Sequence, residues 1–411
     1  MATRRKQVMA LVSSSTGTQL GLWPNIKLRG FTKQVNAGPS ECVILIDEMF
    51  EYTGVDLQLG NEVEVRIADA DSTSQVAGSS AVGLSQAGTR TVFRGYISLI
   101  ENSVEGQKEE VVVHLMGYYT LLGTDYLKSG AATTLYSHSS NGLTTTSGSQ
   151  SAADIGLMVR TVIDRFRAEV NTKLFYQLAE IPNTSTTATY RFEQATYKDA
   201  LEKLRSLAPA GTFYYIDETG RVKFGQKASS PTHTFVFGRH FSSMHVERSL
   251  EKVRNVLLLW NGEPVAGNDI YKGYSNTPSI TKYGRRAAAL VDYGIDNSNG
   301  ADLIGAKFLA DFKDPEVRVI CTIIDNNVGD GKGYDIETIQ PGDTCRFVGF
   351  STGLTDVFYD NMLITAVHYT LEQVEIEVEV AKTRLIDFQE RQGKHIADIQ
   401  SGGQSIPESY T

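Results

Sequence analysis

Segments in which apolar residues occupy every second position, or follow one another without a break, recur along most of the chain. Residues 61–68 alternate strictly: Val63, Val65 and Ile67 lie on one side of an extended chain and charged residues on the other, which predicts a half-buried strand. Residues 42–47 form a mostly apolar run behind a Gly-Pro pair, which is typical of a buried strand. Further strands are predicted over residues 92–101, 111–116, 253–260, 316–325, 344–350, 361–370 and 373–382.

Helical spacing of apolar residues replaces this alternation in three places. The first helix follows Ser151, which we expect to be its N-cap. The second begins after Thr196, with Asp199 three positions on as in a capping box. The third covers residues 300–312 and stops before a proline. A hairpin over residues 212–224 follows the second helix directly, with an Asp-to-Gly turn of the type I kind.

The order of these elements predicts a mainly β, multi-domain protein in which two small antiparallel β-barrel domains flank a helix-plus-hairpin domain of the α+β type. A polar, low-complexity stretch separates the first barrel from the helices. The expected divisions are 1–19 for a flexible N-terminal arm, 20–130 for the first β-barrel domain, 131–250 for the α+β insert, 251–390 for the second, tube-like β-barrel domain and 391–411 for a C-terminal tail.

Composition narrows the class of function. The formal net charge is −9 at pH 7, and an acidic chain without a clustered basic face is not a dedicated nucleic-acid binder. The cysteines Cys42, Cys321 and Cys345 lie in apolar runs without a CxxC pair, so buried thiols are expected rather than disulfides or zinc ligands. The absence of a signal-peptide core and of a long apolar run predicts a soluble protein made in a reducing cytoplasm.

The histidines and polar loops do not form a recognised catalytic or metal-binding motif. His240 and His245 have the wrong spacing for two ligands on one helix face, and His233 could join them only as a cluster on strands. We favour packed or surface histidines. Residues 83–87 are close to a nucleophile-elbow pattern but lack its strand-to-helix context. Residues 325–335 begin like a calcium loop without the glutamate at position 12, which favours a plain hairpin loop. No catalytic, cofactor or metal site is predicted.

Four stretches, in this order along the chain, carry a resemblance to a known family. They are Val92-Phe-Arg-Gly-Tyr-Ile97 with Gly117-Tyr118-Tyr119 after its partner strand, residues 197–204 leading into 213–220, Arg254-Asn255-Val256 with residues 279–286, and Ile339-Gln340-Pro341-Gly342-Asp343-Thr344. Their order resembles that of the phage baseplate hub and tail-hub family, which also covers the hub part of type six secretion spike proteins.

This resemblance implies a non-enzymatic structural protein of the virion tail tip or baseplate. It implies a homotrimer whose two barrels per subunit form a pseudo-sixfold ring between a hexameric tail tube and a threefold tail tip or spike. The expected partners are the chain itself, a tail tube protein or distal tail ring, a tip or spike protein and the tape measure protein, with DNA only in transit through the lumen. No lysozyme-like or spike-repeat pattern occurs near the C-terminus, so the implied role is that of an adaptor.

Three positions are structural and assembly candidates because of their backbone. Gly95 lies inside a strand of the F-x-G-x-I kind, and Pro341 with Gly342 forms a tight turn ahead of a barrel strand. If Gly342 holds a left-handed turn, a β-branched residue there should impair folding or assembly.

Three glutamates, Glu375, Glu377 and Glu379, alternate with apolar residues in the last predicted strand. Carboxylates on one strand face must be solvated or meet a basic partner. An acidic lumen face would repel passing DNA phosphates. An ordinary solvated outer face explains the same pattern, so both interpretations stay open.

Two other classes of function compete with the structural one. A tail-associated peptidase or cell-wall hydrolase would need a convergent catalytic set that includes a residue such as His240. A receptor- or sugar-binding tail protein would need an exposed aromatic cluster, for which Tyr271, Tyr274 and Tyr283 in a predicted loop over residues 261–299 are the candidates.

Overall fold

The chain is described here by a computed structural model. The residues that it describes are 6–24, 26–46, 57–69, 89–105, 108–127, 135–139, 142–144, 153–188, 191–193, 195–209, 211–241, 243–261, 270–292, 295, 298–324, 334–349, 361–371 and 373–379. The mainly β, multi-sheet class predicted from the sequence is confirmed.

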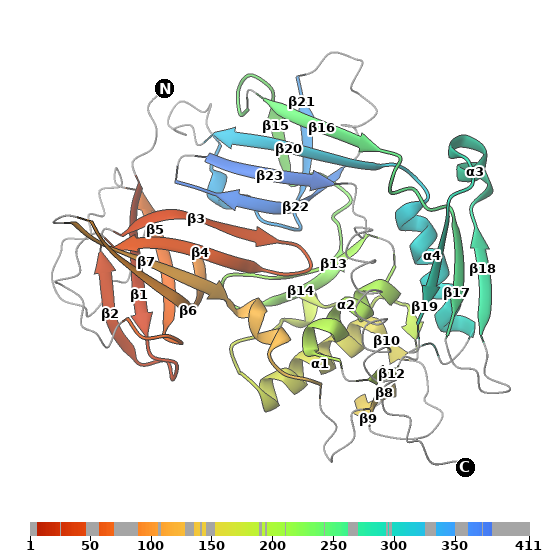
Figure 1. Cartoon of the computed structure of the whole chain (residues 1–411), viewed down its shortest axis with the longest axis horizontal. Coiled ribbons are helices and arrows are strands. Elements are labelled where there is room, and N and C mark those ends of the chain that lie inside the picture. Colours follow the sequence, from red (N-terminus) through yellow and green to blue (C-terminus); the bar gives the residue numbers. More distant parts are fainter. Residues whose placement is uncertain are drawn as a thin grey trace, which may run out of the picture.

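Thirteen strands form one large sheet, drawn at the left and top of Figure 1. Its main path runs β16-β20-β23-β22-β3-β4-β7-β6-β5-β1-β2, with β21 joined to β22 and β15 joined to β21. The strands are β1 (Lys6–Ser13), β2 (Gln19–Pro24), β3 (Lys27–Gln34), β4 (Pro39–Ile46), β5 (Glu62–Asp69), β6 (Thr89–Glu105), β7 (Lys108–Gly117), β15 (His233–Val236), β16 (Met244–Ser249), β20 (Glu316–Ile324), β21 (Thr344–Val348), β22 (Met362–Tyr369) and β23 (Gln373–Glu379). Within the described residues this path stays open, and no closed barrel is detected.

The antiparallel pairing of β3 with β22 joins a strand from the first part of the chain to a strand from its last part. Phe31 lies opposite Tyr369 and Thr32 lies opposite His368, and the rings of Phe31 and Tyr369 stack with centroids 4.6 Å apart. We call this pairing the seam. On one side of the seam lie β1 to β7, and on the other lie the strands of the last third together with β15 and β16. One hydrophobic core runs beneath both sides, so the seam belongs to a continuous packed structure.

A second hydrophobic core lies below the main sheet in Figure 1. Its helices are α1 (Ile155–Glu169), α2 (Tyr197–Leu207), α4 (Ser298–Phe312) and the 3₁₀ turn η2 (Tyr118–Gly123). Its strands include the hairpin β13 (Thr212–Ile216) with β14 (Val222–Gln226), and the sheet of β17 (Val256–Trp260), β18 (Tyr271–Ser275) and β19 (Ala287–Val291).

The remaining elements are short. They are β8 (Leu135–Ser139), β9 (Gly142–Thr144), β10 (Ala153–Asp154), β11 (Thr187–Ala188), β12 (Arg191–Glu193), α3 (Thr277–Tyr283), and the 3₁₀ turns η3 (Leu178–Glu180) and η5 (Ile336–Thr338).

Local signals predicted the helices of the second core well. Thr196 caps α2 and forms the expected capping box with Asp199. The hairpin turn closes with the Gly220 N–H donating to the Asp217 carbonyl, at 3.0 Å. The cap of α1 is Asp154 rather than Ser151, because its carboxylate accepts the N–H groups of the first helical turn. A carboxylate at this position also favours the positive end of the helix dipole.

The prediction of a flexible arm over residues 1–19 is wrong from residue 6 onward. Strand β1 pairs with β5 over its whole length, and Val8, Ala10 and Val12 are buried. Met9 on the other side of the strand is buried as well, so β1 is an ordered strand of the sheet with its register set by the pairing with β5. The C-terminal tail predicted over residues 391–411 lies outside the described residues.

The loop predicted over residues 261–299 is also wrong where the structure describes it. Strands β18 and β19 lie on either side of β17 in the sheet, and the helix α3 connects β18 to β19 along the chain. This sheet packs on α4 within the second core, although the sequence had grouped residues 251–312 with the second barrel. The proposed domain boundaries themselves stay a prediction.

Candidate functional site

Carboxylates and histidines line one face of the main sheet across the seam. Glu375 lies opposite His368, His368 opposite Thr32, and Thr32 opposite Glu41. Residues that lie directly opposite one another share a sheet face. This row therefore crosses four strands, with two from each side of the seam. We call the face that carries it the acidic face.

The acidic face continues on β7 and β6. His114 of β7 lies 3.0 Å from the Glu41 carboxylate and 3.6 Å from that of Glu101. The Glu41 and Glu101 side chains are 54% and 59% exposed, so water solvates most of their charge. Both sides of the seam thus present exposed carboxylates.

The predicted glutamate row is only partly an open acidic surface. Glu375 is exposed, and the side chain of Glu379 lies outside the described set. Glu377 is 9% exposed, because the Arg318 guanidinium donates to its carboxylate at 2.5 Å. Its basic partner therefore lies on β20 of the same chain. A cation at a neighbouring strand position removes most of the repulsion that a row of glutamates would otherwise feel.

His368 links the two sides of the seam on the acidic face. Its Nδ1 shares a 3.0 Å hydrogen bond with the Thr32 hydroxyl, and its Nε2 lies 3.8 Å from the Glu377 carboxylate. The nearby Glu377 carboxylate raises the pKa of His368, against a smaller lowering from burial. The protonated ring is therefore the form that the folded seam favours.

We expect this histidine to make the stability of the chain depend on pH. A raised folded-state pKa contributes stability that is complete below the unfolded value of 6.5 and is lost as pH rises through the folded value. Chemical denaturation of the wild type and of His368→Gln, measured from below pH 6 to above pH 8, gives the difference in unfolding free energy. The difference should shrink toward the alkaline end. A difference that grows toward the alkaline end would contradict the assignment.

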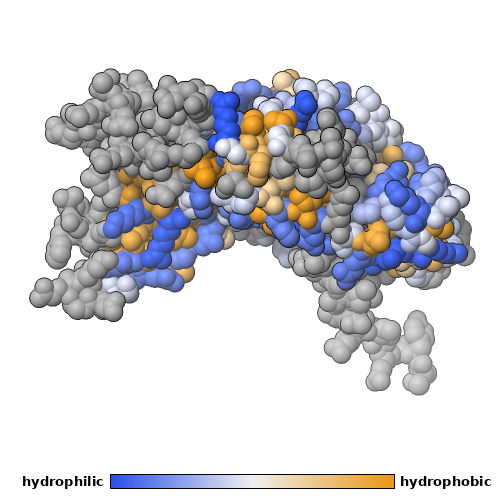
Figure 2. Space-filling view, turned by 90° about the horizontal axis from the view of Figure 1, so that it is seen from above, coloured by the Kyte–Doolittle hydropathy of each residue, from blue (hydrophilic) through white to orange (hydrophobic). Residues whose placement is uncertain are grey.

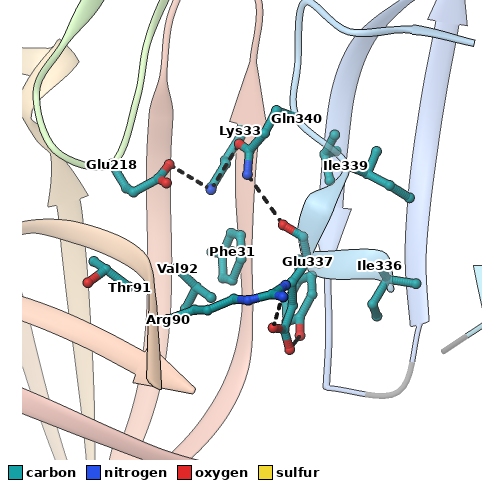
Figure 3. Close-up of a pocket in the computed structure, with 12 residues that line it drawn as sticks. Phe31, Lys33, Arg90, Thr91, Val92, Glu218, Ile336, Glu337, Ile339 and Gln340 are labelled. Atoms are coloured by element: carbon teal, nitrogen blue, oxygen red, sulfur yellow. Dashed lines mark hydrogen bonds and ion pairs between the residues drawn. The ribbon is translucent and has the colours of Figure 1, made fainter. Parts of the chain in front are cut away.

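A pocket of about 300 Å³ opens where the seam meets the second core and η5 (Figure 3). Lys33 lies 3% exposed, with Nζ 3.0 Å from the Glu218 carboxylate and 3.2 Å from the Gln340 side-chain oxygen. Lys33 also lies over the Phe31 ring, at 5.3 Å from its centroid. A buried ammonium is tolerated only when its donors are satisfied in this way. These contacts join β3 to two distant segments. Glu218, in a hairpin turn, is 185 positions from Lys33 in the chain, and Gln340, in a loop, is 307 positions away.

A second ionic group closes the other end of the pocket. Arg90 pairs with Asp335 at 2.8 Å and with Glu337 at 3.6 Å, and the Tyr369 hydroxyl donates to Glu337 at 3.2 Å. Figure 3 shows Lys33 directed toward Glu218 and Gln340, and Arg90 directed toward Glu337. Since each of these three carboxylates contacts a cation, the pocket acts as a polar clamp between segments distant in sequence.

The clamp residues were not predicted from the sequence, although the sequence carries one signal for them. Lys33 is two positions from Phe31 on the same face of β3, which places a charge among inward-facing residues. Such a charge predicts a buried partner. The identity of that partner cannot be read from the sequence, because Glu218 and Gln340 are distant in the chain.

The three backbone candidates lie in tight places. A Cβ on Gly95 would lie 2.1 Å from the Met116 carbonyl oxygen of the neighbouring strand. Gly342 has φ of +93°, and the Asp343 N–H closes the turn on the Gln340 carbonyl at 3.2 Å. With Pro341 ahead of Gly342, this arrangement is a type II turn. The predicted left-handed glycine is confirmed, and any role of these positions in assembly stays a prediction.

The histidines considered for catalysis are separated or packed. His233 is hydrogen-bonded to Asp343 at 3.0 Å and to the Tyr334 hydroxyl. His240 accepts the Val236 N–H at 3.2 Å, and its ring packs on Tyr334. His245 is exposed. Among the described residues no cluster of three or more His, Cys, Asp or Glu could hold a metal ion.

Other sequence candidates have mixed outcomes. The three cysteines are buried, as predicted, and burial raises the pKa of Cys321 to about 12, which leaves its thiol unreactive. The elbow-like residues 83–87 and most of the 325–335 loop lie outside the described residues. Tyr271 is 66% exposed, but Tyr274 packs against α4 at Gly305, so the predicted tyrosine cluster does not form. No described helix is long and apolar enough to cross a membrane.

Comparison with known proteins gives matches in structure alone. No family model matches the sequence, and no curated protein matches it. The 43 kDa tail protein of prophage MuSo2 from Shewanella oneidensis matches with a TM-score of 0.60 and 10% identity, over 90% of this chain and 98% of the other. The chain has the fold of phage tail proteins. The tail protein from Neisseria meningitidis MC58 gives a TM-score of 0.56 at 13% identity, over 91% and 96% of the two chains.

A prophage tail protein, gp18 from Listeria monocytogenes EGD-e, has the same fold, with a TM-score of 0.54 and 10% identity over 94% of this chain and 98% of that chain. The resemblance predicted from four short stretches is thereby confirmed as a likeness in fold. Nearly the whole chain takes part in this likeness, so both cores belong to the shared architecture.

Proposed function

We propose that the chain is a structural subunit of the tail of a phage or phage-like particle, without enzymatic activity or a cofactor. In this proposal three copies form a pseudo-sixfold hub ring. One side of the ring meets a hexameric tail tube or distal tail ring, and the other meets a threefold tail tip or spike. The proposed location is therefore the virion tail tip or baseplate.

The pairing of β3 with β22 is the observation that carries this proposal. It joins strands from both ends of the chain into one sheet over a common core. A subunit that contributes two β units to a ring must hold them at a fixed angle, and an antiparallel pairing backed by buried side chains does so. The Lys33 clamp supports the same rigidity, because it ties this sheet to the second core.

The acidic face supports a role as a wall of the lumen. Exposed carboxylates occur on both sides of the seam, at Glu41, Glu101 and Glu375. Exposed carboxylates repel DNA phosphates and hinder adhesion of DNA in transit, and the cations Arg29 and Arg318 on this face are each paired with a glutamate. Besides DNA, the tape measure protein is the other molecule that we expect to lie in the lumen against this surface.

Imaging of native tail particles, together with the mass of the purified chain, tests the proposal. We expect three copies of the chain in one ring at the distal end of the tail tube, with the acidic face toward the lumen. A ring of another copy number would refute the trimer. A chain that is monomeric in solution and absent from particles would refute the tail role itself.

A further inference from the structure

The third stretch of the family resemblance forms a structural node that the ring does not explain. Asn255 is fully buried. Its Nδ2 donates to the Gly284 carbonyl at 2.7 Å and to the Ser279 hydroxyl at 3.2 Å, and its Oδ1 accepts the Arg286 N–H at 2.8 Å. One amide thus fixes the start of β17, the helix α3 and the start of β19 in one arrangement.

This node displays basic side chains at one end of the β17–β18–β19 sheet. Arg254 precedes Asn255 in the chain, the Arg286 N–H donates to the Asn255 side chain, and Lys282 and Arg285 flank Gly284, whose carbonyl accepts from the same side chain. Arg254 and Arg286 donate to backbone carbonyls, and Lys282 lies over the Tyr283 ring. Within the described residues none of the four makes an ion pair. Four such cations together are unusual in a chain of net charge −9.

The sheet itself has one covered and one open face. Leu257, Leu259 and Leu290 pack on α4 in the second core. The opposite face consists of nine positions without a charged side chain, namely Val256, Leu258, Trp260, Tyr271, Gly273, Ser275, Ala287, Ala289 and Val291. Tyr271 is 66% exposed and Trp260 and Val291 are each 37% exposed, whereas Val256 at the start of β17 is only 5% exposed.

The exposed side chains on the open face call for a partner. Strand β17 pairs with β19 in parallel and with β18 antiparallel, and contiguous apolar surface left exposed on such a sheet marks an interaction site. Figure 1 places this sheet at the far end of the molecule from β1 and β2, and the same end is largely hydrophilic in the view of Figure 2. An uncharged sheet face in hydrophilic surroundings, bounded at one end by cations, has the anatomy of an interface core with a charged rim.

We propose that this open face and its basic end form a docking surface for a neighbouring tail protein. The partner's contacting surface is apolar, with acidic side chains along the edge that meets Arg285 and Lys282. Charge complementarity selects this partner, because a rim of one sign attracts the opposite sign and orients the encounter. DNA would satisfy the cations and leave the apolar face exposed. A second copy of this chain would fit only if it also carried an acidic rim beside an apolar surface, so self-association is tested as an alternative.

Two substitutions and two matched controls test the surface, and the proposal rests on the tail role proposed above. Ala289→Asp places a charge on the open face, and Arg285→Glu reverses the rim. Thr234→Asp and Arg346→Glu make the same changes at exposed strand positions on β15 and β21. Melting curves of the four variants should match that of the wild type, which shows that the fold is intact.

The probes are the purified proteins encoded by the neighbouring tail genes, tested one at a time with this chain. We expect one of them to bind wild type and both controls alike, and to bind Ala289→Asp and Arg285→Glu at least tenfold more weakly. Added salt should weaken wild-type binding more than it weakens binding of Arg285→Glu.

The proposal is overturned if no tail protein binds, if binding ignores both substitutions, or if the substitutions instead break self-association or binding of a short DNA duplex. Recovery of the variants in tail particles separates this inference from the proposed function. Particles that contain wild type, Ala289→Asp and Arg285→Glu equally would refute the docking surface and leave the tail role intact. Particles that lack even the wild type would refute the tail role.

Discussion

Replacing Gly95 with alanine should destabilise the chain by about 3 kcal/mol. The new Cβ would lie 2.1 Å from the Met116 carbonyl oxygen and 3.0 Å from the Phe93 ring. Because the carbonyl belongs to the backbone of β7, it can move only if the β6–β7 pairing opens. Gly95 lies directly opposite Gly117, so two glycines allow the strands to approach closely. Equilibrium denaturation in urea measures the loss as a lower midpoint.

Gly225→Ala is the matched control for this substitution. Gly225 also lies in a strand, but nothing lies within 4 Å of the added Cβ. Alanine there should leave stability unchanged or raise it by up to about 1 kcal/mol, through the lower entropy of the unfolded chain. Equal losses at the two positions would show that the close approach of β6 and β7 is not the cause.

Sequence patterns predicted those parts of the fold whose causes are local. The capping box at Thr196 and the alternation of Val63, Val65 and Ile67 depend on residues a few positions apart, and the structure contains both. The turn before β21 belongs to the same group, because Pro341 and Gly342 set its backbone themselves. The order of these elements was enough to predict the mainly β class and the likeness to phage tail proteins.

The parts that the sequence did not reveal depend on distant partners. The run Val8–Val12 lacks a regular alternation of polar residues and follows a basic segment, so only its pairing with β5 shows it to be a strand. The seam brings together residues separated by 336 positions, as in the Thr32–His368 hydrogen bond. Single-sequence periodicity carries no information about such pairings.

The candidate site shows the same division between local and distant causes. The glutamates of β23 were found from their alternation, but the neutralisation of Glu377 by Arg318 comes from a separate strand. Likewise, the stretch Arg254-Asn255-Val256 was one of the four that carry the family resemblance. The hydrogen bonds that Asn255 makes to Ser279, Gly284 and Arg286 depend on how β17, α3 and β19 lie in space, which the sequence does not reveal.

Gly342→Val should be the second strongly destabilising substitution, at a cost of about 3 kcal/mol, and it should also reduce incorporation into tail particles. The φ of +93° disfavours any residue with a Cβ, and that atom would lie 2.5 Å from the Phe213 ring. The turn also presents Gln340 to Lys33, and the Gly342 N–H donates to the Ile364 carbonyl. Distortion of the turn therefore weakens the clamp between the seam and the second core.

Gly17→Val separates backbone strain from the clash in this prediction. Gly17 has φ of +87° with nothing within 4 Å of an added Cβ, so valine there should cost only about 1–2 kcal/mol. A further comparison tests the clash with the Phe213 ring directly: the stability of Gly342→Ala is measured alone and in combination with Phe213→Leu. The smaller side chain should recover part of the loss, because it removes the ring that the Cβ meets. A Gly342→Val protein as stable as wild type, or one destabilised no more than Gly17→Val, would show that the turn does not support the seam.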